Sequence, residues 1–327
     1  MTGFDRRTFI ALGGALLATE ASAQEHSAAK LAPPTPRREL PPSWRQAQRL
    51  PLWPGEPPGA ASFAPQPLGP DAAPVFLQNV SRPDLHVFRP AHPNGHALLV
   101  MPGGAYRLVS VANEGAEVAA RMNPHGVTLF VLTYRLPGEG WQNQADVPLQ
   151  DAQRAMRVIR SQAKHFDIDA DKVSILGFSA GGHLAATLAT QHAERTYRGV
   201  DAADELSARP FAAGLVYPVV TMESPWTHEV SRTMLLGKTP SAAEISRRSA
   251  ERHIDAATPP VFAVHAMDDP AVPVENTLNF VTAMRAAKRP VEAHLLQEGG
   301  HAFGVGYPNT PSALWIDLFL RWLNRLA

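Results

Sequence analysis

The sequence predicts an α/β fold in which a mostly parallel sheet has helices on both faces. Two observations support this prediction. Short, continuous apolar runs recur along the chain, and segments with helical periodicity lie between them. Strands that are apolar on both sides are buried on both faces, as in a parallel sheet covered by helices. The runs lie at 97–101, 127–132, 173–176, 211–217, 261–265 and 291–296.

The other elements follow from their patterns. Residues 84–89 alternate apolar and polar side chains, which indicates a further strand. Residues 150–166 carry Ala, Met and Ile on one face and most of the basic side chains elsewhere, which predicts an amphipathic helix. Residues 311–326 place Trp, Leu and Phe on one side and predict the last helix. Residues 221–258 form a long connection with helical patches, and the pattern leaves open whether this connection is a lid.

The N-terminal part of the chain differs in composition from the rest. Residues 1–23 combine paired arginines, a short apolar run and an A-x-A pattern, which predicts a twin-arginine signal peptide and a periplasmic or secreted protein without stable membrane insertion after cleavage. Residues 24–74 are rich in proline and predict a linker or a surface-wrapping loop, although the part near Trp44 and Trp53 has apolar side chains able to pack. Residues 75–327 are then expected to form one catalytic domain.

Composition narrows the function classes. Lys plus Arg and Asp plus Glu each number 30, so no basic excess points to nucleic acid. The chain has no cysteine, which excludes disulfides, a thiol nucleophile and a Cys-based metal site. We also expect no metal and no organic cofactor, because we recognise no metal-binding or dinucleotide-binding motif. Composition does not determine the oligomeric state.

One serine stands at a sharp turn between a strand and a helix. Gly177-Phe-Ser-Ala-Gly181 follows the apolar run 173–176 and precedes a run of small residues with helical character. In this context G-x-S-x-G places the serine in a strained, exposed position at the carboxyl edge of the sheet, where open α/β sheets bind ligands. We therefore interpret Ser179 as a nucleophile.

A serine hydroxyl needs a base and an orienting carboxylate to attack at neutral pH. His301 lies among glycines after the last predicted strand, and we interpret it as the base. Two adjacent carboxylates, Asp268 and Asp269, follow the strand before it. The spacing in Asp269-Pro-Ala-Val-Pro273 favours Asp269, but the sequence does not exclude Asp268. His265, at the end of that strand, is interpreted as structural.

Backbone N–H groups are expected to stabilise the oxyanion. The first helical residue after the nucleophile, Ala180, is one candidate donor, and the loop after residue 101 supplies Gly104 and Ala105. Tyr106 and His183 are candidates for lining the pocket. For the other histidines a structural or solvated role is the default.

These residues resemble the α/β-hydrolase superfamily, in the branch of small carbohydrate esterases described as acetyl-xylan-esterase-like or BD-FAE-like. The resemblance covers about residue 50 to the C-terminus. Its blocks are Leu52-Trp-Pro-Gly55, Pro102-Gly-Gly104 with Tyr106, Glu114-Gly115, Tyr134-Arg-Leu136, Asp151-Ala-Gln-Arg-Ala155, 177–186, Tyr217-Pro218, Leu235-Leu-Gly237, Thr258-Pro-Pro260, Asp268-Asp269, Val272-Pro273 and Gly299-Gly-His301.

The resemblance implies a serine esterase that removes a small acyl group, acetyl above all, from a sugar or oligosaccharide. One departure from the family pattern is Ala105, where the family usually has a third glycine; if this position requires a positive φ, alanine is strained. Feruloyl or other short-chain esters remain alternative substrates. A catalytically silent binding module on the same fold is the alternative from a different class.

Overall fold

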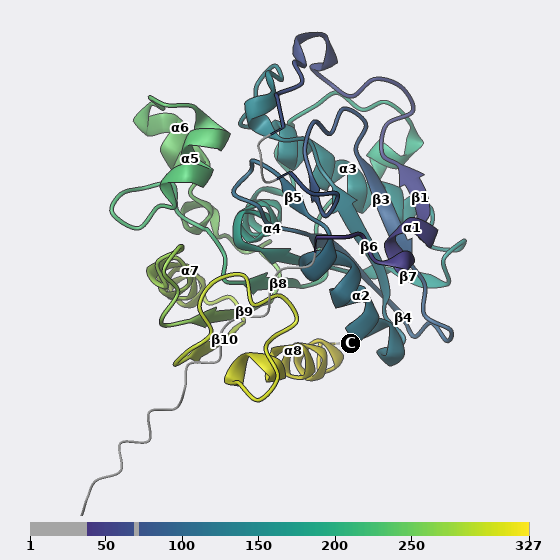
Figure 1. Ribbon diagram of the computed structural model, residues 1–327, viewed down its shortest axis with the longest axis vertical. Helices are drawn as coiled ribbons and strands as arrows, with labels where there is room; N and C mark the ends of the chain where they lie inside the picture. The colour runs from purple at the N-terminus through teal and green to yellow at the C-terminus, as the bar shows by residue number, and fades with distance from the viewer. Residues whose placement is uncertain (1–37, 69–71, 327) are drawn as a thin grey trace, which may run out of the picture. The chain divides into compact units, whose positions relative to one another are not determined.

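A mixed sheet runs through the computed structural model, which describes residues 38–68 and 72–326 (Figure 1). In these ranges the strands are β1 (Gln48–Pro51), β2 (Phe76–Leu77), β3 (Asp84–Phe88), β4 (Gly95–Met101), β5 (Val109–Ser110), β6 (Thr128–Thr133), β7 (Ile168–Phe178), β8 (Ala213–Val216), β9 (Val261–Ala266) and β10 (Val291–Leu296). The main sheet has the order β1-β3-β6-β4-β7-β8-β9-β10, and β2 pairs with β5 in a small separate sheet.

Strands β6, β4, β7, β8, β9 and β10 are parallel to one another, whereas β3 pairs antiparallel with β6 and β1 pairs antiparallel with β3. The chain passes from β4 outward to β6 and then returns to the other side of β4 with β7. The carboxyl ends of β4 and β7 therefore flank a topological switch point, where open α/β sheets bind their ligands. The predicted fold class, a mostly parallel sheet covered by helices, is confirmed.

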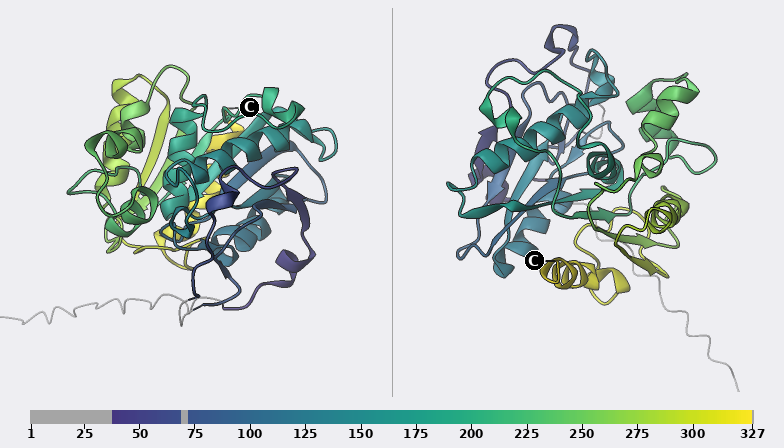
Figure 2. Two further views of the ribbon diagram at one scale, coloured as in Figure 1. Left: turned by 90° about the horizontal axis from the view of Figure 1, so that it is seen from above. Right: turned by 180° about the vertical axis from the view of Figure 1, so that it is seen from behind.

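Helices cover both faces of this sheet (Figures 1 and 2). Helices α3, α4 and α7 pack on one face, and α2 and α8 on the other. Across the described ranges the helices are α1 (Pro42–Gln46), α2 (Glu117–Met122), α3 (Val147–Ser161), α4 (Ser179–Gln191), α5 (Glu229–Leu236), α6 (Ala242–Arg247), α7 (Glu275–Ala286) and α8 (Trp315–Asn324), with a π-helical turn η2 (Ala112–Ala116) and short 3-10 helices η1 (Ala60–Ser62), η3 (Asn123–His125), η4 (Pro137–Glu139), η5 (Ala202–Glu205), η6 (Ala250–His253) and η7 (Pro311–Leu314).

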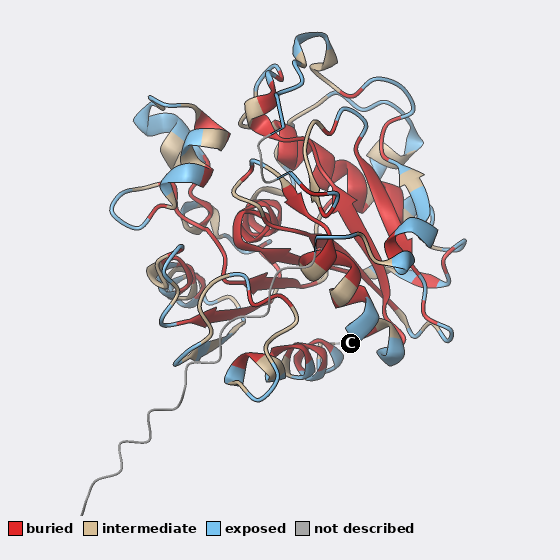
Figure 3. Cartoon of the chain, viewed as in Figure 1, coloured by how far each residue is buried: buried red, intermediate tan, exposed pale blue. Residues whose placement is uncertain are grey.

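The core lies between the sheet and its helices, and Figure 3 shows the central strands and α4 almost entirely buried. Every residue of β6 and β9 is buried, which explains why these strands read as unbroken apolar runs in the sequence. Two helices differ from their predicted ranges. Helix α3 begins at Val147, three residues before the predicted start, with Pro148 in its first turn. The predicted helix over 311–326 is a 3-10 turn followed by α8.

The proline-rich segment contributes more to the fold than the sequence predicts. Residues 48–51 form strand β1, which pairs with β3 at the edge of the main sheet. Trp44, Leu52 and Trp53 are buried in the same core cluster as the central strands. The prediction of a linker or loop over residues 24–74 is therefore incomplete, because its described part includes an edge strand of the sheet. The predicted signal peptide, residues 1–23, lies outside the described residues.

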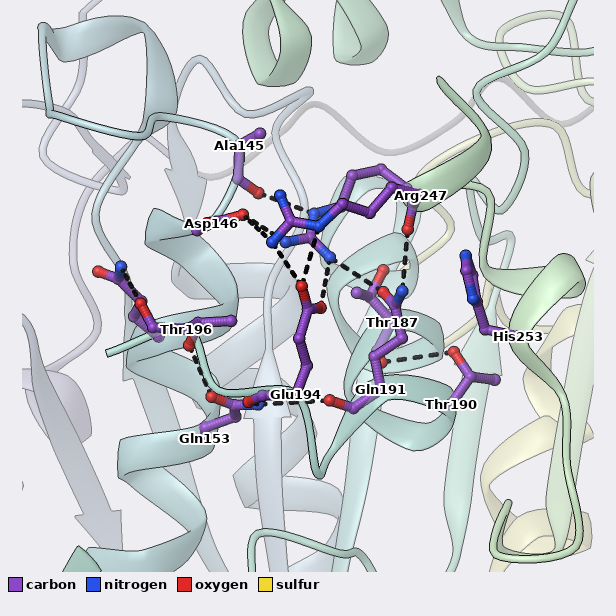
Figure 4. A network of polar contacts seen from close by, with 12 residues as sticks. Ala145, Asp146, Gln153, Thr187, Thr190, Gln191, Glu194, Thr196, Arg247 and His253 are labelled. Carbon is purple, nitrogen blue, oxygen red and sulfur yellow. Dashed lines mark hydrogen bonds and ion pairs between the residues drawn. The ribbon is translucent and has the colours of Figure 1, made fainter. Parts of the chain in front are cut away.

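Residues 221–258 carry α5 and α6, which project from the sheet beside α7 (Figure 1). A network of ion pairs fastens this connection to the core (Figure 4). Arg248 is buried, and its guanidinium contacts Asp146 at the start of α3 and donates to Glu194 after α4 over 2.8 Å. Arg247 contacts the same two carboxylates from a more exposed position.

The pKa of Glu194 reflects this network. Burial raises the pKa of this carboxyl, but the hydrogen bonds and charges of Arg248 and Arg247 outweigh burial and leave the pKa below its ordinary value. The network therefore holds a charged carboxylate beside two arginines at the base of the 221–258 connection.

In the described part of the chain, no helix is both long and apolar enough to cross a bilayer.

Candidate active site

The turn from β7 into α4 carries Ser179. Strand β7 ends at Phe178, and Ser179 is the first residue of the helix with a φ of 51°, a left-handed conformation that is costly for a residue with a Cβ. The turn brings α4 close to strand β4: a Cβ at Gly181 would lie only 2.1 Å from the carbonyl oxygen of Met101. Glycine at this position therefore lets the two backbones approach each other at the corner. The predicted exposed position is not seen, because Ser179 is buried with 6% of its surface exposed.

His301 reaches Ser179 from the loop after β10. Its Nε2 atom lies 2.9 Å from the Ser179 Oγ atom, and its Nδ1 atom lies 2.7 Å from Oδ2 of Asp269. The three residues are far apart in the sequence and meet because β7, β9 and β10 are parallel, with their carboxyl ends at one edge of the sheet. The structure therefore brings the three predicted residues together, with His301 within hydrogen-bonding distance of both Ser179 and Asp269.

The two adjacent aspartates have different contacts. The Asp269 side chain is fully buried, and its Oδ1 accepts the N–H groups of Ala271 and Val272 over 2.8 and 2.9 Å. Asp268 points the other way, and its Oδ1 accepts the N–H groups of Gly299 and Gly300, just before His301. Asp269 thus contacts the imidazole itself, whereas Asp268 holds the loop that carries it.

These contacts determine where the proton of His301 lies. The Asp269 carboxylate only accepts hydrogen bonds, so Nδ1 of His301 carries the hydrogen. Burial raises the pKa of Asp269, but hydrogen bonds from His265 and His301 outweigh burial and leave the pKa well below its ordinary value. With a neutral imidazole, Nε2 is unprotonated and faces the Ser179 hydroxyl, which is the arrangement that a general base requires.

His265 also contacts the Asp269 carboxylate, which the sequence analysis did not predict. Its Nε2 atom lies 3.1 Å from Oδ2 of Asp269 and 3.2 Å from the Val272 carbonyl oxygen. Both partners are acceptors, so Nε2 carries the hydrogen, and Nδ1 accepts the hydroxyl of Thr277 on α7 over 2.8 Å. The interpretation of His265 as structural therefore omitted its bond to Asp269. Its position four residues before Asp269, at the end of the same strand, was the available signal.

The loop after β4 lies directly against Ser179. A Cβ on Gly103 would come within 2.9 Å of the Ser179 Cβ, so the two segments are in close contact. Gly104, Ala105 and Tyr106 have φ values of 130°, 56° and 58°, three positive values in succession. Within the described part of the chain, no hydrogen-bond acceptor is seen for the N–H of Gly104 or Ala105. The N–H of Ala180 is in the first turn of α4, where N–H groups have no partner inside the helix.

Tyr106, in this loop, and His183, on α4, are buried and bonded to each other. The Tyr106 hydroxyl lies 2.7 Å from Nδ1 of His183, whose Nε2 lies 2.7 Å from the Arg248 carbonyl oxygen. The Arg248 carbonyl can only accept a hydrogen bond, so Nε2 of His183 carries the hydrogen. Nδ1 of His183 then accepts the hydrogen bond from the Tyr106 hydroxyl. Both residues line a small pocket together with Leu184, Leu235 and Arg248, and the lining of that pocket does not include Ser179. The hydrogen bond between Tyr106 and His183 thus holds the loop after β4 against helix α4.

The electrostatic setting of His183 agrees with these bonds. Burial lowers the pKa of His183 to about 4, so that its imidazole is neutral at pH 7. A neutral imidazole is the form that accepts a hydrogen bond at one nitrogen and donates one at the other.

Residues 221–258 come close to the candidate triad. Burial lowers the pKa of His228, and the charge of His301 acts in the same direction. The Trp226 carbonyl accepts the side-chain amide of Asn276 on α7 over 2.8 Å, while the Trp226 side chain is exposed. The connection is therefore held in place by its contact with α7 and by the ion pairs of Arg248.

No group of three or more His, Cys, Asp or Glu side chains within residues 38–68 and 72–326 is arranged to hold a metal ion.

The sheet order, the turn that carries Ser179 and the loops that bring His301 and Asp269 to it define an α/β-hydrolase. The BD-FAE family model matches residues 85–284, and the chain belongs to this family. Its sequence is 31% identical over 237 residues to an acetylxylan esterase of Xylanibacter ruminicola, covering 70% of this chain and 45% of that protein. It is 35% identical over 208 residues to an endo-1,4-beta-xylanase B of Butyrivibrio fibrisolvens, covering 64% of this chain and 32% of that protein.

The chain therefore spans less than half the length of these two relatives. Among solved structures, it is similar to an acetyl ester-xyloside bifunctional hydrolase from Caldicellulosiruptor lactoaceticus, with a TM-score of 0.72 and 30% identity over 86% of this chain and 96% of that one.

Proposed function

We propose that this chain is a serine carboxylesterase that removes small acyl groups, chiefly acetyl, from carbohydrate esters. The observation that carries the proposal is the line of contacts from Ser179 Oγ through His301 to Asp269, with distances of 2.9 and 2.7 Å. This is the arrangement by which a serine hydroxyl becomes a nucleophile at neutral pH. The names of the relatives support the substrate class, because one is an acetylxylan esterase and a structural neighbour is an acetyl ester-xyloside bifunctional hydrolase.

In the proposed reaction, His301 Nε2 takes the Ser179 proton as Oγ attacks the acyl carbon. The tetrahedral oxyanion accepts hydrogen bonds from the N–H of Ala180 and from the Gly104–Ala105 loop. His301 then gives its proton to the oxygen of the leaving alcohol. A water molecule activated by His301 attacks the acyl-enzyme, and the carboxylic acid leaves with the Ser179 hydroxyl restored. Asp269 holds the imidazole in the required tautomer and stabilises the imidazolium.

The first test compares hydrolysis of p-nitrophenyl acetate, butyrate and ferulate, together with acetate release from acetylated xylan. Ser179→Ala and Asp269→Asn are expected to lower kcat by about 10⁴-fold or more, since one removes the nucleophile and the other the tautomer control. Asp268→Asn is the matched control. Its side-chain oxygen still accepts from Gly299 and Gly300, so we expect a loss of less than about tenfold, well short of the loss expected for a triad acid.

The outcomes separate mechanism from substrate. Acetate-selective turnover that disappears in Ser179→Ala supports the proposal in full. A preference for ferulate keeps the mechanism and contradicts the acyl group. If the parent turns over no ester, or if Ser179→Ala is as active as the parent, the triad assignment is wrong, and a binding module on this fold becomes the better description.

A further inference from the structure

A second buried carboxylate lies close to the triad and has no place in the reaction described above. Glu114 is 3% exposed and belongs to the π-helical turn η2, whose wide turn shows in the bond from the Ala116 N–H to the Val111 carbonyl over 2.9 Å. Single π-helical turns are rare and are frequent at functional sites. In the sequence, Glu114 is part of a family block, but the sequence indicates no role for it.

Both oxygens of Glu114 are occupied by donors from other segments. Oε2 accepts the N–H of Gly103 over 2.7 Å, and Oε1 accepts the hydroxyl of Tyr217 over 2.8 Å. The Tyr217 oxygen in turn accepts the N–H of Gly304 over 3.0 Å. Because the Tyr217 oxygen accepts the hydrogen bond from the Gly304 N–H, the hydroxyl hydrogen of Tyr217 points at Glu114.

These contacts connect the loops on either side of Ser179. Gly103 belongs to the loop after β4 that carries the proposed oxyanion donors Gly104 and Ala105, here called the oxyanion loop, and it packs on Ser179. Gly304 belongs to the loop that carries His301, and the Tyr217 ring lies edge-on to the His301 imidazole with the ring centres 4.9 Å apart. One carboxylate thus links the oxyanion loop and the loop of the base through a single tyrosine.

The bond to Gly103 also bears on which amides remain for the substrate. Glu114 accepts the hydrogen bond from the N–H of Gly103, so this amide is not free to bind the substrate. The N–H groups of Gly104 and Ala105 have no acceptor among the described residues. Burial raises the pKa of Glu114, while the hydrogen bonds from Tyr217 and Gly103 and the charge of His301 oppose that rise.

We propose that Glu114 is a positioning residue for the esterase reaction: it holds the oxyanion loop and the His301 loop in register across Ser179. The inference rests on the proposed function and adds a role to that site. It predicts that loss of the link harms the transition state more than the binding of the ester, because displacement of the donors or the base by about 1 Å costs on the order of 100-fold in rate.

The experiment uses Glu114→Gln and Tyr217→Phe, singly and together, with Glu139→Gln as the matched control. Glu139 is also a buried glutamate whose pKa burial raises, and it accepts the N–H of Asn79 outside the triad loops. Four quantities are measured: kcat and KM for p-nitrophenyl acetate, the rate at which a fluorophosphonate labels Ser179 with loss of fluoride, and the melting temperature.

We expect each single variant to lose about 10- to 100-fold in kcat and in labelling rate, with KM changed by no more than a few-fold. The double variant is expected to lose little more than the poorer single variant, because both substitutions break the same link. Glu139→Gln is expected to keep the parent kcat and labelling rate. Where Glu114→Gln gives too little folded protein, Tyr217→Phe tests the same link and leaves the carboxylate in place.

The inference is wrong if Glu114→Gln and Tyr217→Phe keep kcat and labelling rate within about threefold of Glu139→Gln while their melting temperatures fall, since Glu114 is then only structural. If the parent is labelled at Ser179 but hydrolyses no ester, the proposed function fails, and the labelling rates of the variants still decide the role of Glu114. If the parent is not labelled, both proposals fail.

Discussion

Ala105 has a left-handed backbone conformation at a position where the family usually has glycine. The sequence predicts that alanine is strained here if the position requires a positive φ. The φ of Ala105 is 56°, so the backbone has this strained conformation. Neighbouring contacts hold the strained loop: the Tyr134 hydroxyl donates to the Pro102 carbonyl over 2.7 Å, and Tyr106 is bonded to His183. Strain of this kind persists where the surroundings over-determine it.

The first prediction concerns this strain. Ala105→Gly is expected to raise the free energy of unfolding by about 0.5–1 kcal/mol, because the relief of a left-handed alanine exceeds the added entropy of glycine in the unfolded chain. Ala120→Gly is the control, since Ala120 is exposed within α2 and its replacement costs about 1 kcal/mol. Urea unfolding measures both variants. A loss of stability in Ala105→Gly similar to that of the control contradicts the assignment of strain.

At the scale of elements, the connection between β8 and β9 is fastened by a pair of arginines with different surroundings. The Arg248 side chain is 2% exposed and that of Arg247 is 45% exposed, although both contact Asp146 and Glu194. Removing one partner of a buried ion pair leaves an uncompensated buried charge, whereas an exposed pair is screened by water. The Arg248 carbonyl also bonds His183, so the same residue joins the α5–α6 connection to the support of the oxyanion loop.

The second prediction compares these two arginines. Arg248→Met is expected to lower the free energy of unfolding by about 3–5 kcal/mol, because Glu194 and Asp146 lose their buried partner. Arg247→Gln is expected to cost less than about 1 kcal/mol. Equilibrium urea unfolding at low and high salt measures the difference. Equal losses for the two variants would show that burial does not decide the strength of this network.

At the scale of the whole molecule, stability depends on pH through histidines that are buried in the neutral form. Burial lowers the pKa of His86, His96, His183, His192 and His228, and the pKa of His183 falls to about 4 from 6.5. Between these two values, the unfolded chain binds a proton at His183 that the folded chain does not. The contribution of neutral His183 to the free energy of unfolding is therefore fully present above pH 6.5, and it decreases as the pH falls toward 4.

The third prediction isolates this contribution. His183→Gln is expected to lose part of the pH dependence of stability between pH 4 and 6.5, up to about 3 kcal/mol across the window. Above pH 7 the two proteins are expected to differ by a constant amount. Chemical unfolding at half-unit pH steps gives both curves. If the parent and the variant have the same slope over the window, His183 does not bind a proton on unfolding in this range.

The sequence by itself determined the succession of strands and helices, the sharp turn at Ser179 and the loops that carry its candidate partners. These features are local: apolar runs and helical periodicity indicate buried elements, and glycines next to a serine indicate a turn where backbones approach. The predicted pairing of Ser179 with His301 also depended on the order of the motifs along a parallel sheet, whose loops meet at one edge.

The tertiary structure alone decided the finer contacts. It directed Asp269, instead of Asp268, at His301, added His265 to the same carboxylate, and bonded Tyr106 in the loop after β4 to His183 on α4. It also turned part of the proline-rich segment into strand β1 and joined two loops through Glu114. The physical reason is that these contacts depend on the direction of single side chains and on segments that are distant in the sequence, and neither is encoded in the spacing of residues along the chain.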